Sequence, residues 1–267
     1  MIQSRPLCLR LSPPKLQFWL LHHYYLSRRD RWRMLYDNAP LTDAPSIRMQ
    51  LIPGDILSDR VAFTGHCFEG ALSRRVVELG GVGGIMIDVG ANLGYFSLLW
   101  ASCHSSNRVF AFEAATRNVD TLRTNISRNG MNDRIRVIPC AAAAEAGVIY
   151  FDPGPEEQRG WGGISPAKSG SSYEVQAVRV DEMVPADTQV SLLKVDAEGA
   201  DTLVLMGCEG LLKRGAIREI WYEENASRRE RLGIPRDEAQ RYLESMGYHV
   251  RAQDKSLTEF IAVRTTP

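Results

Sequence analysis

The chain has 267 residues, 44% of them hydrophobic and 24% charged, as expected for a globular protein with one large domain or one domain plus an appendage. Its 32 lysines and arginines balance 32 aspartates and glutamates, which argues against a nucleic-acid partner held by bulk electrostatics. The five cysteines form no CxxC pair, which disfavours a disulfide framework or a zinc site and favours a reducing, cytoplasmic setting.

The N-terminal region, up to about residue 80, predicts helices and a short strand pair without clean alternation. Residues 16–26, "LQFWLLHHYYL", are too few to span a bilayer and predict an amphipathic helix packed on the main domain. Contact with a membrane surface or a partner, and a lid over a hydrophobic ligand, are the alternatives. Residues 46–63 predict two strands with their turn at Pro53-Gly54-Asp55, and residues 69–80 predict a helix.

From residue 84 onward, strands and helices alternate along the sequence. Such alternation predicts a parallel sheet covered by helices on both faces, and the final strand pair predicts an antiparallel hairpin that completes the sheet. Extra β structure is expected at 147–154 and 174–184, around a mobile Gly- and Ser-rich loop. The expected strands are 84–89, 108–114, 135–143, 190–199, 217–225, 248–253 and 259–264, and the expected helices are 95–104, 117–130, 200–215 and 235–247.

The segment "IMIDVGANLGYFSL", residues 85–98, combines a buried strand, a glycine turn and a helix start. Gly90 would allow a tight turn close to a ligand, and Gly94 would let the helix pack on the strand. Asp88, just before the turn, would repel a pyrophosphate. It suits a cationic amine, such as the amino-acid end of S-adenosylmethionine, or an acid acting through water. We expect Asn92 to cap the helix and also to touch the ligand.

Glu113 stands at the end of the second strand, 23 residues after Gly90. An acid at about this distance accepts hydrogen bonds from ribose hydroxyls in nucleotide-binding α/β proteins. A solvated strand end is the alternative for Glu113 taken alone. Together with the glycine turn, it predicts a nucleoside site.

With these motifs the chain resembles the FkbM family of S-adenosylmethionine-dependent methyltransferases, from about residue 52 to the C-terminus. The family usually has proline at the position of Ala114 and often tyrosine at the position of Phe68, but neither difference removes a charged group. The first 50 residues resemble nothing that we can place. The matching segments are 54–70, 87–98, 109–130, 180–183, 192–207 and 219–225, among them "DVGANLGYFS" and "KVDAEGAD".

The resemblance implies an α/β fold of the Rossmann-like class I methyltransferase type, with a seven-stranded, mostly parallel sheet and a C-terminal antiparallel hairpin. Residues 81–267 would form this domain, and residues 1–80 an N-terminal helical/β extension that contributes to the acceptor site. The implied acceptor is a hydroxyl of a small molecule such as a sugar, a polyketide or another secondary metabolite. A homodimer through the N-terminal aromatic segment is left open.

The implied cofactor is S-adenosylmethionine, with S-adenosylhomocysteine as product. Cys140 and Ala141, after the third strand, are expected near the adenine, and Glu69 over the amino-acid end or the acceptor. The alternative for Glu69 is that it is simply an acidic residue in the first turn of a helix. The predicted cofactor contacts are Glu69, Asp88, Gly90, Ala91, Asn92, Gly94, Tyr95, Phe96, Glu113, Ala114, Cys140, Ala141 and Asp196.

Carboxylates at the ends of the fourth and fifth strands are candidates for the catalytic base. Asp196 and Glu198 stand two residues apart, so both would face one side if the strand continued, and Lys194 shares their parity. Neighbouring like charges would raise at least one pKa. We expect Asp196 as the base, with Glu198 and Glu223 next. The alternatives are a helix N-terminal acid pair, a Mg²⁺ site that we do not favour, and a non-catalytic module that binds an adenosyl ligand and acts through a partner protein.

Overall fold

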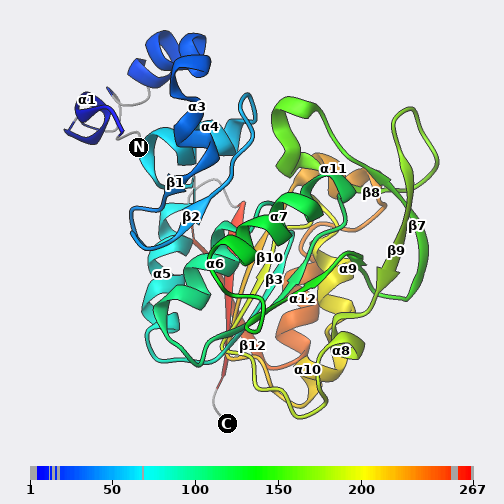
Figure 1. Cartoon of the computed structure of the whole chain (residues 1–267). Helices are drawn as coiled ribbons and strands as arrows, with labels where there is room; N and C mark the ends of the chain where they lie inside the picture. Colours follow the sequence, from blue (N-terminus) through cyan, green and yellow to red (C-terminus); the bar gives the residue numbers. More distant parts are fainter. Residues whose placement is uncertain are drawn as a thin grey trace.

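A seven-stranded sheet runs through the centre of the computed structural model, which describes residues 5–11, 13, 16, 19–67, 69–253 and 258–265 (Figure 1). The strand order is β12-β13-β11-β10-β3-β4-β5, and β13 alone runs in the opposite direction to the other six strands. The predicted α/β fold with a C-terminal antiparallel hairpin is therefore confirmed. The strands are β3 (Ile85–Val89), β4 (Arg108–Phe112), β5 (Ile135–Ile138), β10 (Leu192–Val195), β11 (Glu219–Glu223), β12 (Tyr248–Ala252) and β13 (Glu259–Arg264).

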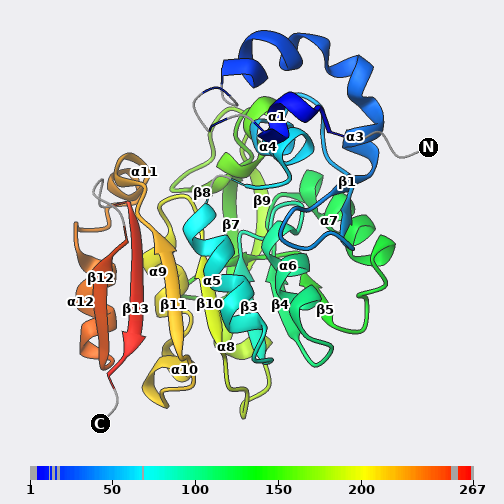
Figure 2. The same cartoon turned by 90° about the vertical axis from the view of Figure 1, so that its left-hand side faces the viewer.

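Helices cover both faces of this sheet, as Figure 2 shows. Successive strand residues point to opposite faces. Met86 and Leu192 belong to one buried apolar cluster, whereas Ile87 and Leu193 belong to the other. The near-continuous apolar runs of β3 and β10 thus follow from burial on both sides. The first cluster includes α5 (Gly70–Gly80), α6 (Tyr95–Cys103) and α7 (Thr116–Arg128), and the second includes α8 (Val180–Met183), α9 (Asp201–Met206), α10 (Glu209–Lys213) and α12 (Glu238–Ser245).

The order of the strands creates a crevice beside the end of β3. The chain passes from β3 to β4 on one side, and later returns to place β10 on the other side of β3. Ligands of open α/β sheets bind outside the carboxyl ends of the strands at such a switch point. The turn at Gly90, the side chain of Glu113 and the side chain of Asp196 all follow strands that end at this edge.

The region between β5 and β10 forms a second, four-stranded sheet in the order β6-β9-β7-β8. The expected third strand, 135–143, is wrong in length, because the chain there is divided between β5 of the central sheet and β6 of the second sheet. The expected helix 200–215 is likewise divided into α9 and α10, and α11 (Ala226–Arg231) was not predicted. The second sheet consists of β6 (Ala141–Ala142), β7 (Gly147–Asp152), β8 (Gly163–Ser165) and β9 (Tyr173–Val178), with the 3-10 segment η3 (Glu156–Trp161) between β7 and β8.

The strand pair expected over residues 46–63 is wrong. Its first half contributes only β2 (Arg48–Met49), which pairs with β1 (Ala39–Pro40). Its second half is the helix α4 (Ile56–Thr64). The Pro53-Gly54 turn leads into a helix because Asp55 caps it: its Oδ2 accepts a hydrogen bond from the Ser58 N–H at 2.9 Å. The expected helix 69–80 is confirmed as α5.

The described residues from 5 to 37 (5–11, 13, 16 and 19–37) form what we call the N-terminal projection, which lies beyond the carboxyl ends of the parallel strands (Figures 1 and 2). It packs on α4 through Tyr25 and Trp32, whose rings contact Phe63. Leu21 and Tyr25 of the stretch 16–26 are buried, but the ring contact of Tyr25 is with α4, in the N-terminal region and not in residues 81–267. Its helical elements are α1 (Leu7–Leu11), η1 (Leu21–Tyr25), η2 (Leu26–Trp32) and α3 (Arg33–Asp37).

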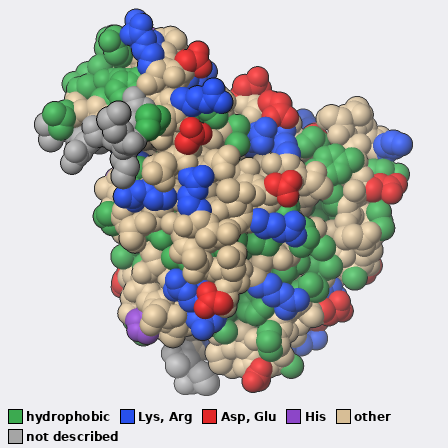
Figure 3. All heavy atoms as spheres, in the orientation of Figure 1, with side chains coloured by type: hydrophobic (Ala, Val, Ile, Leu, Met, Phe, Trp, Pro, Cys, Tyr) green, Lys and Arg blue, Asp and Glu red, His purple; other side chains and the backbone are tan. Residues whose placement is uncertain are grey.

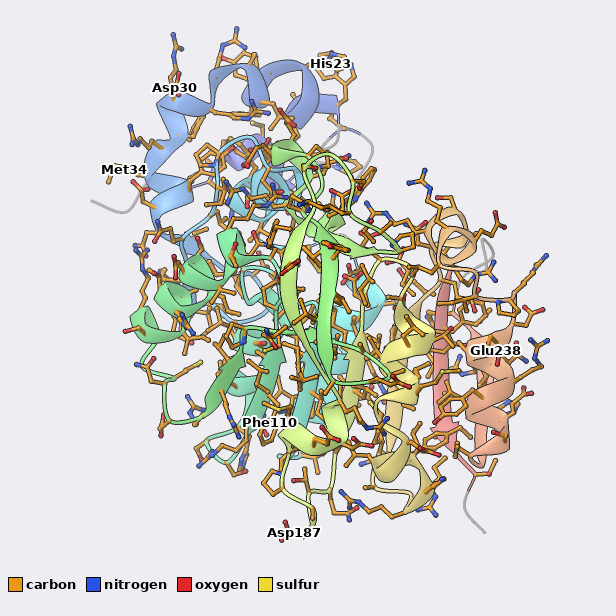
Figure 4. The ribbon with its side chains drawn as sticks, turned by 90° about the vertical axis from the view of Figure 1, so that its right-hand side faces the viewer. His23, Asp30, Met34, Phe110, Asp187 and Glu238 are labelled. Carbon is orange, nitrogen blue, oxygen red and sulfur yellow. The ribbon has the colours of Figure 1, made fainter. Side chains whose placement is uncertain are left out.

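In Figure 4, His23, Asp30 and Met34 lie on this projection, and Asp187 lies at the opposite end of the molecule. Phe18, part of the aromatic run, and Phe68, where the family often has tyrosine, fall outside the described residues. Across the described ranges, we find no helix that combines the length and the apolar character needed to cross a membrane.

Candidate active site

Two cavities meet at the switch point, and Asp196 lines both of them. The larger, of about 600 Å³ and open to solvent, we call the switch-point cavity. The smaller, of about 320 Å³, we call the acidic cavity. The switch-point cavity is walled by the ends of β3, β4 and β10, by residues 140–142 and by the segment from β7 to β8. The acidic cavity is lined by Glu69, Leu72, Lys194, Val195, Asp196, Trp221, Tyr222, Glu223 and Glu259.

The glycine turn after β3 fits only a residue without a side chain. Gly90 has a φ of 73°, and a Cβ there would lie 2.1 Å from the Asp196 carbonyl oxygen. The N–H groups of Gly90 and Ala91 both donate to the Phe112 carbonyl, at 3.0 and 2.9 Å. The turn therefore ties the ends of β3, β4 and β10 together and brings bare backbone to the cavity wall.

Glu113 is buried at the floor of the switch-point cavity. Its Oε2 accepts a hydrogen bond from the Asn92 N–H at 2.7 Å, and its Oε1 accepts one from the Ala115 N–H at 2.8 Å. Burial raises the pKa of Glu113 to about 7, although these backbone bonds act in the opposite direction. Oε1 also lies 3.5 Å from the donor Asn118 Nδ2, whereas Oε2 keeps a second lone pair with which Glu113 can accept a hydrogen bond from a ligand hydroxyl.

Two buried amide oxygens lack partners at this cavity. Oδ1 of Asn92 and Oδ1 of Asn118 have no hydrogen-bond partner among the described residues, and both residues line the cavity. A buried acceptor without a donor costs free energy, so both oxygens suit a ligand that carries N–H or O–H groups. The sequence predicted Asn92 at the ligand, but its expected role as a helix cap is wrong, since α6 begins after Gly94 and has no side-chain cap. Asn118 was not predicted, because a polar residue in the first turn of α7 has no distinctive pattern.

Backbone from η3 and its flanks covers the switch-point cavity. The Arg159 N–H donates to Asp55 Oδ1 at 3.0 Å, and Asn118 Nδ2 donates to the Arg159 carbonyl at 3.2 Å. Arg228 Nη2 donates to the Trp161 carbonyl at 2.6 Å. We call residues 156–163 the strap. The strap comes from the loop that the sequence predicted to be mobile, and its contribution to the site was missed because glycine-rich backbone carries no side-chain signal.

A buried lysine stands between the two cavities. Lys194 Nζ lies 3.4 Å from Asp88 Oδ1 and 3.6 Å from Asp196 Oδ2, and it donates to the Val89 and Gly90 carbonyls at 3.2 and 3.0 Å. Burial opposes the charge on Lys194, but the adjacent carboxylates of Asp88 and Asp196 outweigh it and raise its pKa above the ordinary value. Lys194 and Asp196 were expected to face the same side of the strand, and in the structure they form an ion pair.

Asp88 does not face either cavity. Its side chain is fully buried, accepts a hydrogen bond from Ser97 Oγ at 2.6 Å and contacts Lys194. The structure therefore corrects the expectation that Asp88 meets a cationic amine directly. With this geometry its carboxylate fixes Lys194 below the turn.

The structure brings seven of the predicted cofactor contacts to the switch-point cavity. Tyr95 and Phe96 are buried below the turn instead, and Lys194 Nζ lies 5.5 Å from the centre of the Phe96 ring. Ala91 and Gly94 also lie outside the cavity lining, and Glu69 lines the acidic cavity. The seven are Gly90, Asn92, Glu113, Ala114, Cys140, Ala141 and Asp196.

The acidic cavity gathers carboxylates from distant parts of the chain. Glu69 Oε2 is buried and has no hydrogen-bond partner among the described residues. Burial and the charge of Asp196 raise the pKa of Glu69 to about 8 and that of Glu223 to about 7. These groups can therefore change protonation state near neutral pH, as the clustering of carboxylates predicted. Glu259 of β13 completes the set and was not predicted.

Glu198 stands apart from both cavities. The strand β10 ends at Val195, and Glu198 has a φ of 50°, so the parity argument that placed it beside Asp196 is wrong. Its Oε2 accepts a hydrogen bond from Asn225 Nδ2 at 2.9 Å and lies 3.8 Å from Arg228 Nε. Burial, and then the charge of Asp196, raise the pKa of Glu198 to about 7.

The alternative of a Mg²⁺ site needs a group of ligating side chains. No three His, Cys, Asp or Glu side chains of the described residues form a group that could hold a metal ion.

Residues 88–250 match the family model described as the methyltransferase FkbM domain, which covers more than half of the chain. The chain belongs to the FkbM methyltransferase family. It is 28% identical over 193 residues to methyltransferase sdnD of Sordaria araneosa, covering 60% of this chain and 72% of that protein. It is also 28% identical over 181 residues to the 31-O-demethyl-FK506 methyltransferase FkbM of Streptomyces tacrolimicus, covering 56% and 67%.

Among solved structures, methyltransferase FkbM from Methylobacillus flagellatus KT aligns with a TM-score of 0.48 and 14% identity. The alignment covers 88% of this chain and 59% of that one. For this FkbM-family chain the fold therefore rests on its own strand order, and the methyltransferase class rests on the family match.

Proposed function

We propose that this FkbM-family methyltransferase uses S-adenosylmethionine to methylate a hydroxyl group of a small molecule. The observation that carries the proposal is the position of Asp196, whose carboxylate lies where the nucleoside-sized switch-point cavity meets the acidic cavity. The name of the Streptomyces relative, a 31-O-demethyl-FK506 methyltransferase, supports a hydroxyl acceptor.

The residues of the switch-point cavity fit the cofactor. Glu113 Oε2, which accepts the Asn92 N–H, keeps a second lone pair for a ribose hydroxyl, and the unpartnered Oδ1 atoms of Asn92 and Asn118 can accept from amine or hydroxyl groups. The small side chains of Cys140 and Ala141 leave room for a flat base at the far wall. The backbone at Gly90 can approach the amino-acid part closely.

When bound, the cofactor supplies an electrophilic methyl group on a sulfonium. The contribution of the chain is to align an acceptor oxygen with that group, to keep water out and to remove the hydroxyl proton. Asp196 is our first assignment for the base, because it lines both cavities. Lys194, 3.6 Å from its carboxylate, holds it in place.

Glu223 and Glu69 are the next candidates to receive the proton. Both line the acidic cavity; a pKa of about 7 lets Glu223 accept a proton near neutral pH, and a pKa of about 8 lets Glu69 do so above neutral pH. Glu198 is held by Asn225 outside both cavities, so we assign it a structural role in the turn after β10.

Cofactor binding is tested by thermal denaturation of the full chain with S-adenosylmethionine. At a hundred times the dissociation constant, the ligand should stabilise the fold by about 2.7 kcal/mol. Glu113→Ala should abolish this shift, whereas Glu174→Ala, at an exposed position of β9, should leave it intact. A parent protein whose melting does not respond to millimolar cofactor would contradict the proposal.

Methyl transfer is tested with radiolabelled S-adenosylmethionine and the small-molecule fraction of a cell extract. Asp196→Asn should lower the rate by about 10²- to 10⁴-fold while a cofactor-induced thermal shift is retained, because the amide keeps the size of the side chain and one accepting oxygen at the cavity wall. Asp187→Asn, at the opposite end of the molecule, is the control (Figure 4). Normal turnover in Asp196→Asn would refute the base assignment. Cofactor binding without any transfer by the parent would favour the non-catalytic adenosyl-binding module.

A further inference from the structure

The N-terminal projection exposes a group of large apolar side chains. The exposed fractions are 54% for Trp19, 48% for Tyr24 and 48% for Met34, and Leu7 and Leu16 are also exposed. Figure 3 shows hydrophobic side chains gathered on the projection, with lysine or arginine side chains beside them. Five of the eleven large hydrophobic residues that are exposed in the described chain thus fall within this short stretch. Such a concentration marks an interaction surface rather than scattered surface residues.

The same segment is rich in arginine. Residues 26–34, "LSRRDRWRM", contain four arginines and one aspartate, whereas the whole chain is neutral. Arg29 is committed to the fold, because its guanidinium binds the carboxylate of Asp59 at 2.9 Å. Arg31 and Arg33 are exposed, and the guanidinium of Arg28 lies 4.2 Å from the centre of the Tyr24 ring. The apolar group therefore has a positively charged border.

The internal packing of the projection holds these side chains outward. Leu21, Tyr25 and Leu35 are buried, and Tyr25 packs against Phe63 of α4. Trp19 and Tyr24 belong to the same helical run but face away from that contact, and the Trp19 ring lies 5.1 Å from His23. One face of the run thus anchors to the protein and the other presents aromatic and aliphatic side chains to solvent.

We propose that the N-terminal projection docks the protein onto the surface of an anionic lipid bilayer. Tryptophan and tyrosine at the border of an apolar face favour the headgroup level of a bilayer, and the adjacent arginines complement acidic headgroups. The projection lies at the same end of the molecule as the strand ends that line both cavities (Figures 1 and 2). The docked protein would therefore hold this end towards the lipid.

A second copy of the chain is a poorer occupant of this surface. A two-fold contact through the same patch would bring Arg31 and Arg33 of both copies to one interface, where like charges disfavour association. An anionic bilayer can bury the apolar side chains and also attract the arginines beside them through its acidic headgroups. This inference does not depend on the proposed reaction, and its test needs no acceptor.

The test is co-sedimentation of the full chain with two kinds of vesicle, phosphatidylcholine alone and an equal mixture of phosphatidylcholine and phosphatidylglycerol. We expect binding to the mixed vesicles that falls as salt rises, and little binding to neutral ones. Trp19→Ser with Tyr24→Ser should weaken binding at least about tenfold. Arg31→Gln with Arg33→Gln should weaken it about 25-fold at low salt and remove the preference for anionic lipid.

Val148→Ser is the matched control, because Val148 is exposed on β7 away from the projection. It should bind the mixed vesicles like the parent. Circular dichroism should show the helix content of the parent in all variants, since none of the replaced side chains is buried. The proposal is overturned if the parent does not sediment with mixed vesicles, if the control and the tryptophan–tyrosine variant bind equally, or if light scattering shows a dimer that Trp19→Ser with Tyr24→Ser dissociates.

Discussion

The two cavities that share Asp196 are built by different means. The switch-point cavity is made largely of backbone and small residues, and its carboxylate, Glu113, is satisfied by two N–H groups. The acidic cavity is made of side-chain carboxylates that raise one another's pKa values, and Glu69 Oε2 has no partner in the described structure. A site of fixed backbone and small residues, with two amide oxygens left to accept hydrogen bonds, is suited to hold a ligand of fixed shape. A site of unsatisfied, repelling acids is suited to move a proton.

The largest expected effect comes from filling the turn of the switch-point cavity. Gly90→Ala would place a Cβ 2.1 Å from the Asp196 carbonyl at a φ of 73°, so the backbone must move. We expect a loss of about 2–4 kcal/mol in the free energy of unfolding and at least a hundredfold loss of cofactor affinity. Chemical denaturation and isothermal titration calorimetry with S-adenosylmethionine measure the two effects.

Gly130→Ala is the matched control for that change. Gly130 has a φ of 64°, but a Cβ there would meet nothing within 4 Å. It should therefore show the cost of the left-handed backbone alone, about 1 kcal/mol, with normal cofactor affinity. If both variants behaved alike, close approach at Gly90 would not be what shapes the cavity.

The same contrast explains what the sequence could predict. Gly90, Asn92 and Glu113 follow short motifs in which local spacing fixes the geometry, and the structure places all three at the switch-point cavity. Glu259 joins the acidic cavity only because β13 pairs with β11, a contact between distant segments that no local pattern encodes. Asp88 was predicted to meet the amine of a ligand, but in the structure its carboxylate contacts Lys194. This contact forms because β10, which carries Lys194, pairs with β3, and the local sequence around Asp88 does not encode that pairing.

The prediction of secondary structure failed where a short sequence pattern is compatible with two different structures. Pro53-Gly54-Asp55 is typical of a hairpin turn, but the same aspartate can cap a helix. In the structure Asp55 caps α4 with one oxygen, and its other oxygen accepts the N–H of Arg159, more than a hundred residues away, which no local pattern could show. The parallel strands were easier to predict from the sequence, because strands buried on both faces have continuous apolar runs such as 85–87 and 192–193.

The acidic cavity should make the stability of the free protein depend on pH. The pKa of Glu69 is raised to about 8 by burial and by Asp196, whereas in the unfolded chain it returns to its ordinary value. The folded state therefore binds more protons at neutral pH, and the stability that the protonated group contributes is lost as pH rises through about 8.

Glu69→Gln cannot ionise and should keep that stability. We expect this variant to match the parent near pH 5 and to exceed it by about 1–2 kcal/mol at pH 9, in urea titrations without cofactor. Glu174→Gln, exposed on β9, should follow the parent at every pH. Parallel curves for Glu69→Gln and the parent would show that Glu69 is not protonated in the folded protein.

The smallest effect concerns the strap that links the switch-point cavity to the N-terminal region. Asp55 caps α4 with one oxygen and accepts the Arg159 N–H with the other. Asp55→Ala should cost about 1–2 kcal/mol of stability and weaken cofactor binding by about three- to tenfold, because the strap loses its anchor. Asp55→Asn keeps one accepting oxygen and should fall between the parent and Asp55→Ala in both respects. A loss of stability with unchanged cofactor affinity in Asp55→Ala would mean that the strap forms no part of the binding site, and the switch-point cavity would then be made by the strand ends alone.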